Sequence, residues 1–93
     1  MDKYEGVFNG AGIGDIPGTM TLKHEGGKIS GSLDMPLGPA HITSGTYAEG
    51  KLMMNLDAGG SEMTITAKLD GDKISGEWEL EGQTGTLELN RKE

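Results

Sequence analysis

Cysteine is absent from this 93-residue chain, and aromatic side chains are scarce, with one Trp, one Phe and two Tyr. Without cysteine there is no disulfide framework, no thiolate nucleophile and no cysteine-ligated metal, which fits a reducing compartment. Long apolar runs are missing as well, so no segment predicts a membrane-spanning helix. The N-terminus also lacks the apolar core of a signal peptide. The sequence leaves the location open, and we take the cytoplasm as the default.

Basic residues are few, since 8 Lys and Arg stand against 15 Asp and Glu and give a net charge of −7. Nucleic acids and anionic membranes are bound through clusters of Lys and Arg, and the sequence has no such cluster. We therefore expect neither nucleic acid nor membrane as a partner. High charge with few branched apolar residues is also typical of disorder. The regular alternation of apolar and polar residues outweighs that signal.

This alternation defines eight short segments, and no window has a helical period. Glycine makes up 17 of the 93 residues and separates the segments, as tight turns require. The expected strands are 3–8, 18–24, 28–35, 40–47, 51–57, 62–69, 73–80 and 84–91. The pattern predicts an all-β chain that forms one domain over residues 1–93.

The tetrapeptide Lys-Ile-Ser-Gly occurs twice, at 28–31 and at 73–76. A shift of 45 residues superimposes the two copies and also aligns TMTLK (19–23) with TITAK (64–68). The chain thus contains an internal repeat, and each unit supplies four strands.

The repeat divides the chain into halves of approximately 4–48 and 49–93. A four-stranded sheet leaves two edges open, so we expect the two halves to close on each other. The sequence predicts an eight-stranded antiparallel up-and-down barrel. A two-sheet β-sandwich is the alternative.

Turn chemistry sets the strand registers, because a slip of one residue would turn every side chain to the wrong face. A two-residue loop at 71–72 places Ile65 opposite Trp78, and one at 81–82 places Trp78 opposite Gly85. A large side chain opposite a glycine suits a crowded, curved interior.

The hairpin around residues 48–50 is interpreted as a three-residue loop, because Ile42 then meets Leu56. In this register Met53 points outward beside Tyr47, and the two side chains are expected to form a small exposed apolar spot.

Together these registers direct one set of large side chains into the barrel. The set is Phe8, Met20, Leu22, Ile29, Leu33, Met35, Ile42, Leu52, Met54, Leu56, Met63, Ile65, Leu69, Ile74, Trp78, Leu80, Leu87 and Leu89. Small inward residues are expected among them at Gly31, Ser44, Ala67, Gly76 and Gly85.

The order of a strand, a G-G-K or G-D-K turn, I-S-G and a Leu-rich last strand resembles small lipocalin-like (calycin-type) β-barrel domains of bacteria. Such domains occur alone or appended to enzymes, notably amidohydrolases, and the resemblance spans the whole chain. It implies a barrel but lends no settled activity. The G-x-W motif that lipocalins and avidin-like proteins carry on the first strand is missing, and Trp78 lies on the seventh segment. Their pocket residues are therefore not transferred.

The glycine-rich segment 9–18 invites comparison with a phosphate-binding loop, but such a loop needs a helix behind it, and here a strand follows. We interpret it as a connection between strands. In a second interpretation, Ile13 and Ile16 fold back over one opening of the barrel.

His24 takes the place of Leu69 in the repeat, so we expect it to point inward near a barrel end, where an imidazole can orient a ligand. No ligand set with metal spacing accompanies it, and no metal or cofactor is expected. His41 is expected on the surface. No nucleophile–base pair or spaced carboxylate pair stands out, so no catalytic residue is assigned and the chain is not expected to be an enzyme.

Four methionines are expected inside the barrel: Met20, Met35, Met54 and Met63. Methionine suits a plastic apolar pocket, but it also fills a tapering core. We predict a non-enzymatic barrel that binds a small apolar or amphipathic ligand in its interior. The ligand-binding residues would be Phe8, Met20, His24, Met54, Met63 and Trp78. The alternative is a solid-cored structural or interaction module that contacts a partner protein or forms a homodimer.

Overall fold

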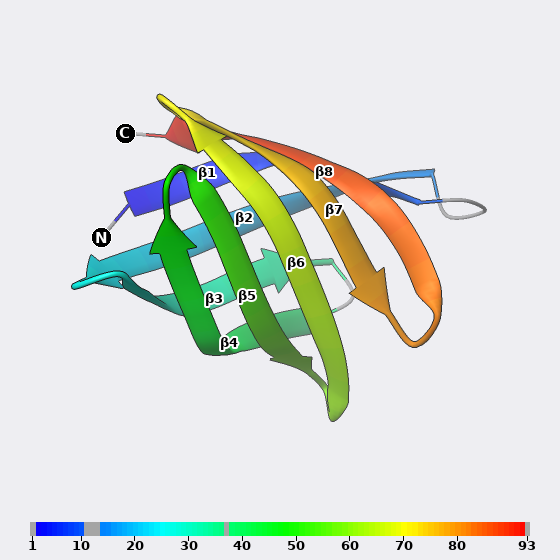
Figure 1. The fold of residues 1–93 in the computed structure, drawn as a ribbon. Helices are drawn as coiled ribbons and strands as arrows, with labels where there is room; N and C mark the ends of the chain where they lie inside the picture. Colours follow the sequence, from blue (N-terminus) through cyan, green and yellow to red (C-terminus); the bar gives the residue numbers. More distant parts are fainter. Residues whose placement is uncertain (1, 11–13, 37, 93) are drawn as a thin grey trace.

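The computed structural model describes residues 2–10, 14–36 and 38–92, and these residues form eight antiparallel strands (Figure 1). The strands are β1 (Asp2–Gly10), β2 (Gly14–Glu25), β3 (Lys28–Met35), β4 (Gly38–Ala48), β5 (Lys51–Ala58), β6 (Ser61–Asp70), β7 (Lys73–Leu80) and β8 (Gln83–Lys92). Their positions match the eight segments expected from the alternation.

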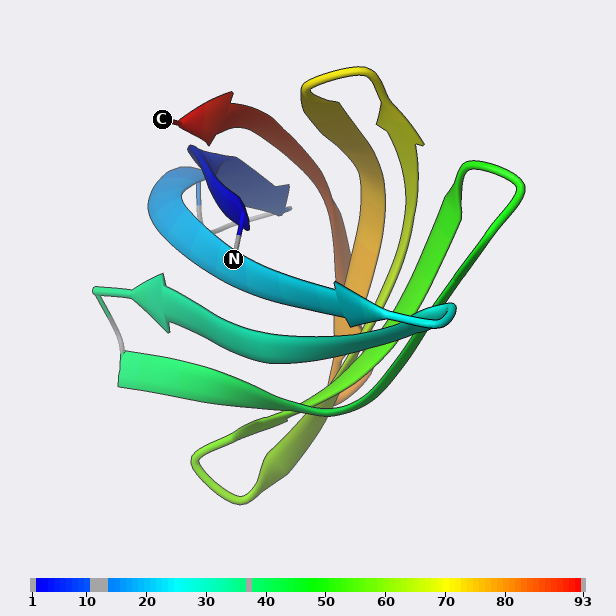
Figure 2. The same cartoon turned by 90° about the vertical axis from the view of Figure 1, so that its left-hand side faces the viewer.

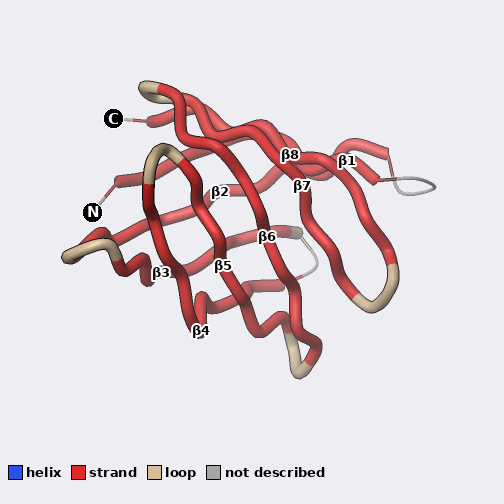
Figure 3. The backbone as a smooth tube through the Cα atoms, in the orientation of Figure 1, coloured by secondary structure: helices blue, strands red, loops and turns tan. Residues whose placement is uncertain are grey.

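Each strand pairs with the next one along the chain, and β8 pairs with β1 to close the barrel. Figure 2 shows the strands arranged around a common interior, and Figure 3 shows that the described chain consists of strands and turns. The predicted up-and-down barrel is confirmed, and the sandwich alternative is wrong because all eight strands form one closed barrel.

The two copies of Lys-Ile-Ser-Gly begin β3 and β7, each directly after a tight turn. The pair Met20↔Leu33 in the β2–β3 hairpin corresponds to Ile65↔Trp78 in the β6–β7 hairpin after the 45-residue shift. In both copies a Cβ on the glycine would overlap a backbone oxygen of the preceding strand. The glycine therefore permits two strongly bent strands to approach closely.

The β4–β5 hairpin differs from the prediction. Its turn has two residues, Glu49 and Gly50, with φ angles of 51° and 78°, and Ala48 pairs with Lys51. Both positive φ values are those of a type I′ turn, whose twist matches that of the strands. The expected three-residue loop is therefore wrong.

The pair Ile42↔Leu56 nevertheless forms, because the register of β4 shifts between Ile42 and Ser44. This β-bulge adds one residue, Thr43, inside the strand instead of in the turn. The shift turns Ser44 outward, contrary to the prediction, and brings Gly45 inward against Met54.

Tyr47 also lies differently from the prediction. It pairs with Leu52 and packs against the core, whereas the neighbouring Met53 points outward and is 55% exposed. The two side chains therefore do not form the exposed apolar spot that the three-residue loop implied.

The middle of the barrel is filled with apolar side chains, and Met20, Leu33, Ile65, Ile74 and Leu89 are fully buried. Every large apolar side chain predicted to point inward is buried or half-buried, whereas His24, also predicted inward, is exposed. Tyr4 and Ala40 belong to the core as well and were not predicted.

The connection between β1 and β2 is shorter than the glycine-rich segment suggested, since β2 already begins at Gly14. Pro17 therefore lies inside a strand. The β2–β3 ladder starts only at Thr19, so residues 14–18 pair with β1 alone. Proline has no backbone N–H to donate to a neighbouring strand. It is tolerated there because this part of β2 has no second partner strand. Ile13 lies outside the described residues.

Candidate functional site

The barrel has two distinct ends. The terminal end carries both chain termini and the turns at 26–27, 49–50 and 71–72 (Figure 1). The opposite end carries the turns at 59–60 and 81–82, and we call it the cavity end.

A cavity of about 110 Å³ lies inside the cavity end. It is lined by Phe8, Ile16, Met35, Met63, Trp78, Leu80 and Gln83. The first six are apolar, and the side chains of β1, β2, β3, β6, β7 and β8 all contribute. Gln83 is exposed, so its amide is the polar group at the opening.

One wall of this cavity is rigid. The ring of Trp78 lies over Gly85, where a Cβ would come within 2.7 Å of two ring atoms. Its indole N–H donates a hydrogen bond of 3.2 Å to the backbone oxygen of Asn9. The Phe8 ring lies over Gly18 in the same way, with a ring atom 2.7 Å from the position of a Cβ. Glycines on neighbouring strands thus fix both aromatic rings against the sheet.

The other wall is adaptable, because Met35 and Met63 are flexible side chains that fit varied shapes. Ile16 and Met35 are only half-buried, and they stand where β2 extends beyond its pairing with β3. Ile16 reaches this place as part of a strand, not as part of a lid loop.

The structure brings together three of the six predicted site residues, since Phe8, Met63 and Trp78 all line the cavity. Met20 and Met54 are buried but do not line it. Met20 belongs to the filled part of the interior, and Met54 lines the second hollow described below.

His24 lies at the terminal end, away from the cavity. It is exposed and packs edge-on against Tyr47, with ring centroids 5.2 Å apart. His24 therefore provides no polar group to the cavity.

Four lining residues were absent from the predicted site: Ile16, Met35, Leu80 and Gln83. Met35 and Leu80 had been placed inside the barrel, and both end their strands. Because both residues are the last of their strands, the sequence could have placed them at this end of the barrel.

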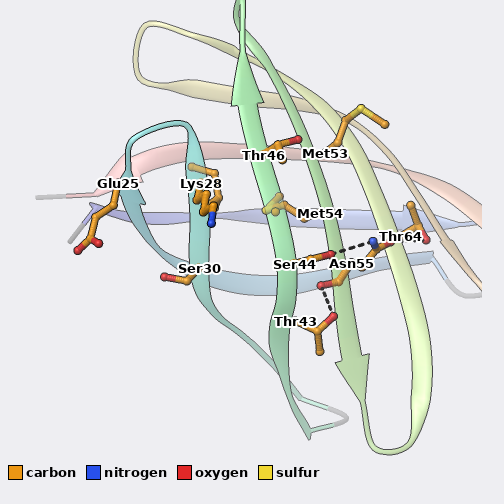
Figure 4. A pocket seen from close by; sticks show the side chains of 12 residues that line it. Glu25, Lys28, Ser30, Thr43, Ser44, Thr46, Met53, Met54, Asn55 and Thr64 are labelled. Carbon is orange, nitrogen blue, oxygen red and sulfur yellow. Dashed lines mark hydrogen bonds between the residues drawn. The ribbon is translucent and has the colours of Figure 1, made fainter.

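A second hollow is an open groove of about 710 Å³ on the outer face beside the β4 bulge (Figure 4). Its lining combines outward polar side chains with Met53, Met54 and Ile29. The Thr43 hydroxyl donates to the backbone oxygen of Asn55 at 3.1 Å, and the Asn55 amide donates to the Ser44 hydroxyl at 3.0 Å.

The Thr64 hydroxyl completes this network by donating to the Asn55 side-chain oxygen at 3.3 Å. Thr43, Ser44, Asn55 and Thr64 of the groove therefore already bond to one another. The lining of the groove is also much more polar than that of the cavity, so the groove is less suited to an apolar ligand.

Within the described part of the chain, no three His, Asp or Glu side chains gather to hold a metal ion. Residues 2–10, 14–36 and 38–92 contain no helix long and apolar enough to cross a membrane.

No family model and no curated protein matches the chain in sequence. Among solved structures, the fold is similar to that of a Schistosoma mansoni fatty acid binding protein in complex with arachidonic acid. The TM-score is 0.52 at 13% identity, and the match covers 84% of this chain and 73% of that one. The likeness is one of fold alone. A bacterial origin and attachment to an amidohydrolase stay predictions.

Proposed function

We propose that this protein is a non-enzymatic binding protein that holds the apolar part of a small ligand in the cavity at the end of the barrel. The observation that carries the proposal is the apolar cavity itself, with one rigid aromatic wall, one adaptable methionine wall and an amide at the opening. Small-molecule sites commonly combine a concave apolar lining with a few polar groups.

The volume limits what the cavity holds. A cavity of about 150 Å³ lined by Leu, Ile and Phe binds one benzene molecule. At about 110 Å³, this one accommodates a single ring or a few methylene groups, with some movement of Met35 and Met63. The rest of the ligand extends through the opening past Gln83.

This size also sets the expected affinity. Burial of about 150 Å² of apolar ligand surface at about 25 cal/mol per Å² gives about 4 kcal/mol. That free energy corresponds to a dissociation constant of about 1 mM. Contacts outside the cavity would add to this value for a larger natural ligand.

The test is a titration with 2-phenylethanol, a neutral molecule with one ring and one hydroxyl. Trp78 is the only tryptophan and lines the cavity, so its fluorescence reports binding directly. We expect a saturable change with a dissociation constant of about 1 mM.

A matched pair of variants locates the effect. Leu80→Phe fills the cavity and is expected to weaken binding at least about tenfold, since the ring no longer fits. Leu69→Phe makes the same change at a half-buried leucine of the terminal end and is expected to leave binding unchanged.

Two outcomes would contradict the proposal: no saturable change in the wild type, or equal weakening by both variants. If the protein binds no ligand but forms a dimer as its concentration rises, the alternative of an interaction module replaces the proposed one. Sedimentation of the same samples measures this directly.

A further inference from the structure

The charged side chains are distributed unequally between the two ends of the barrel. All eight basic residues lie toward the terminal end: Lys3, Lys23, Lys28, Lys51, Lys68, Lys73, Arg91 and Lys92. Lys23, Lys73, Arg91 and Lys92 form ion pairs with acidic side chains of the same end, such as Lys73 with Glu88 at 2.9 Å and Lys92 with Glu5 at 3.1 Å.

The cavity end carries acidic side chains instead. They are Asp15, Asp34, Asp57, Glu62, Glu79 and Glu81. The sole basic group there is the imidazole of His41, whose residue pairs with Asp57.

The acidic residues follow from the alternation of the strands, because each inward apolar residue of the cavity has an outward neighbour. Asp15 precedes Ile16, Asp34 precedes Met35 and Glu62 precedes Met63. Leu80 lies between Glu79 and Glu81. Outward carboxylates therefore stand next to the inward residues that line the cavity.

Three of these carboxylates accept hydrogen bonds from neutral groups of the described chain. Asp15 accepts from the Asn9 amide, Asp57 from the backbone N–H of Gly60 at 3.0 Å, and Glu81 from the Ser61 hydroxyl at 2.6 Å. Asp and Glu are negatively charged at neutral pH. These bonds hold the carboxylates in place without cancelling their charge.

We propose that the ligand of the cavity is an apolar amine, with its hydrocarbon part in the cavity and its positive charge at the acidic rim. The proposal rests on the proposed function, because the cavity must first bind the apolar part. The positive charge of the expected ligand follows from Coulomb's law. The carboxylates of the cavity end favour a cation over an anion by about tenfold or more at low salt, and screening weakens this preference.

This charge distinguishes the expected ligand from that of the structural neighbour. The Schistosoma mansoni protein holds arachidonic acid, which is a carboxylic acid. A carboxylate at the opening of this barrel would instead face Glu62, Glu79 and Glu81, with no lysine or arginine at that end to pair with it.

The experiment compares three probes with the same phenylethyl group: 2-phenylethylamine, 2-phenylethanol and 3-phenylpropanoate. At about pH 8 the amine is charged. We expect the amine to bind best and the carboxylate worst, with affinities that differ by about tenfold or more in about 10 mM salt. The difference is expected to shrink to a fewfold in about 0.5 M salt.

A pair of variants with equal net charge tests whether the rim itself selects the cation. Glu62→Gln with Glu79→Gln removes two charges at the cavity end, and Glu25→Gln with Glu49→Gln removes two at the terminal end. The first variant is expected to reduce the preference for the amine at least twofold more than the second. An equal reduction in both variants would overturn the proposal.

Equal binding of the three probes by the wild type would also overturn it, while leaving the apolar site intact. Loss of all binding, including that of the neutral alcohol, would refute the proposed function itself. The neutral probe therefore separates the two failures.

Discussion

Replacement of Trp78 by alanine is expected to lower the free energy of unfolding by about 3–5 kcal/mol. The side chain is only 5% exposed, and a buried aromatic residue removes about 150–250 Å² from water. At about 25 cal/mol per Å² this burial gives about 4–6 kcal/mol, which agrees with that range. The lost hydrogen bond to Asn9 adds little, because Asn9 is exposed and water replaces the donor.

The assay is urea unfolding followed by far-UV circular dichroism, since the variant has no tryptophan. A domain of this length has a stability of about 5–14 kcal/mol, so the loss is easily measured. A loss below about 1 kcal/mol would refute the placement of Trp78 against Gly85 and the barrel wall built on it.

The same variant joins the space of the missing indole to the existing cavity. Added indole is therefore expected to restore part of the stability, by about 1.4 kcal/mol at ten times its dissociation constant. The gain should be larger in Trp78→Ala than in the wild type. An equal increase in stability in the variant and in the wild type would mean that indole does not occupy the vacated space.

Two other substitutions test the glycine packing and the turns by the same urea assay. Gly85→Ala is expected to cost about 2 kcal/mol or more, because the new Cβ would overlap the backbone oxygen of Asn9. The exposed Thr84→Ala is its control and should change stability by less than about 0.5 kcal/mol. Glu49→Asn is expected to gain about 0.5–1 kcal/mol, since asparagine tolerates the positive φ of this turn better than glutamate. Glu77→Asn on an exposed strand position should give no gain, and equal effects at both sites would contradict the reasoning.

Most of the registers followed from the sequence because antiparallel hairpins are local. A two-residue turn after Asp70 leaves one register that buries Ile65 and Trp78 together, and the structure has this pair. The pairing of β8 with β1 was predicted only indirectly, from the argument that open strand edges are unfavourable in a small sheet.

The β4 bulge could not be placed from the pattern. The alternation changes phase between Ile42 and Leu52, and a longer turn or an extra residue in the strand accounts for the change equally well. The structure uses the bulge at Thr43, which keeps a tight turn and buries Tyr47 opposite Leu52. That choice depends on packing between distant side chains.

The site was predicted only in part for a similar reason. Strand alternation tells which side chains face inward, but it does not tell where the interior is filled. Met20 and Met63 have the same inward direction, yet only Met63 borders the cavity. His24 follows the inward alternation too, but it lies at the rim of the terminal end, where solvent reaches it.

The most direct test of the account is methyl NMR of the methionines during titration with 2-phenylethanol. Met35 and Met63 line the cavity, whereas Met53 and Met54 line the outer groove, so the two hollows carry separate reporters. We expect the ε-methyl signals of Met35 and Met63 to move with saturation and those of Met53 and Met54 to stay in place. Movement confined to Met53 and Met54, or no saturable movement at all, would contradict a ligand site inside the barrel end.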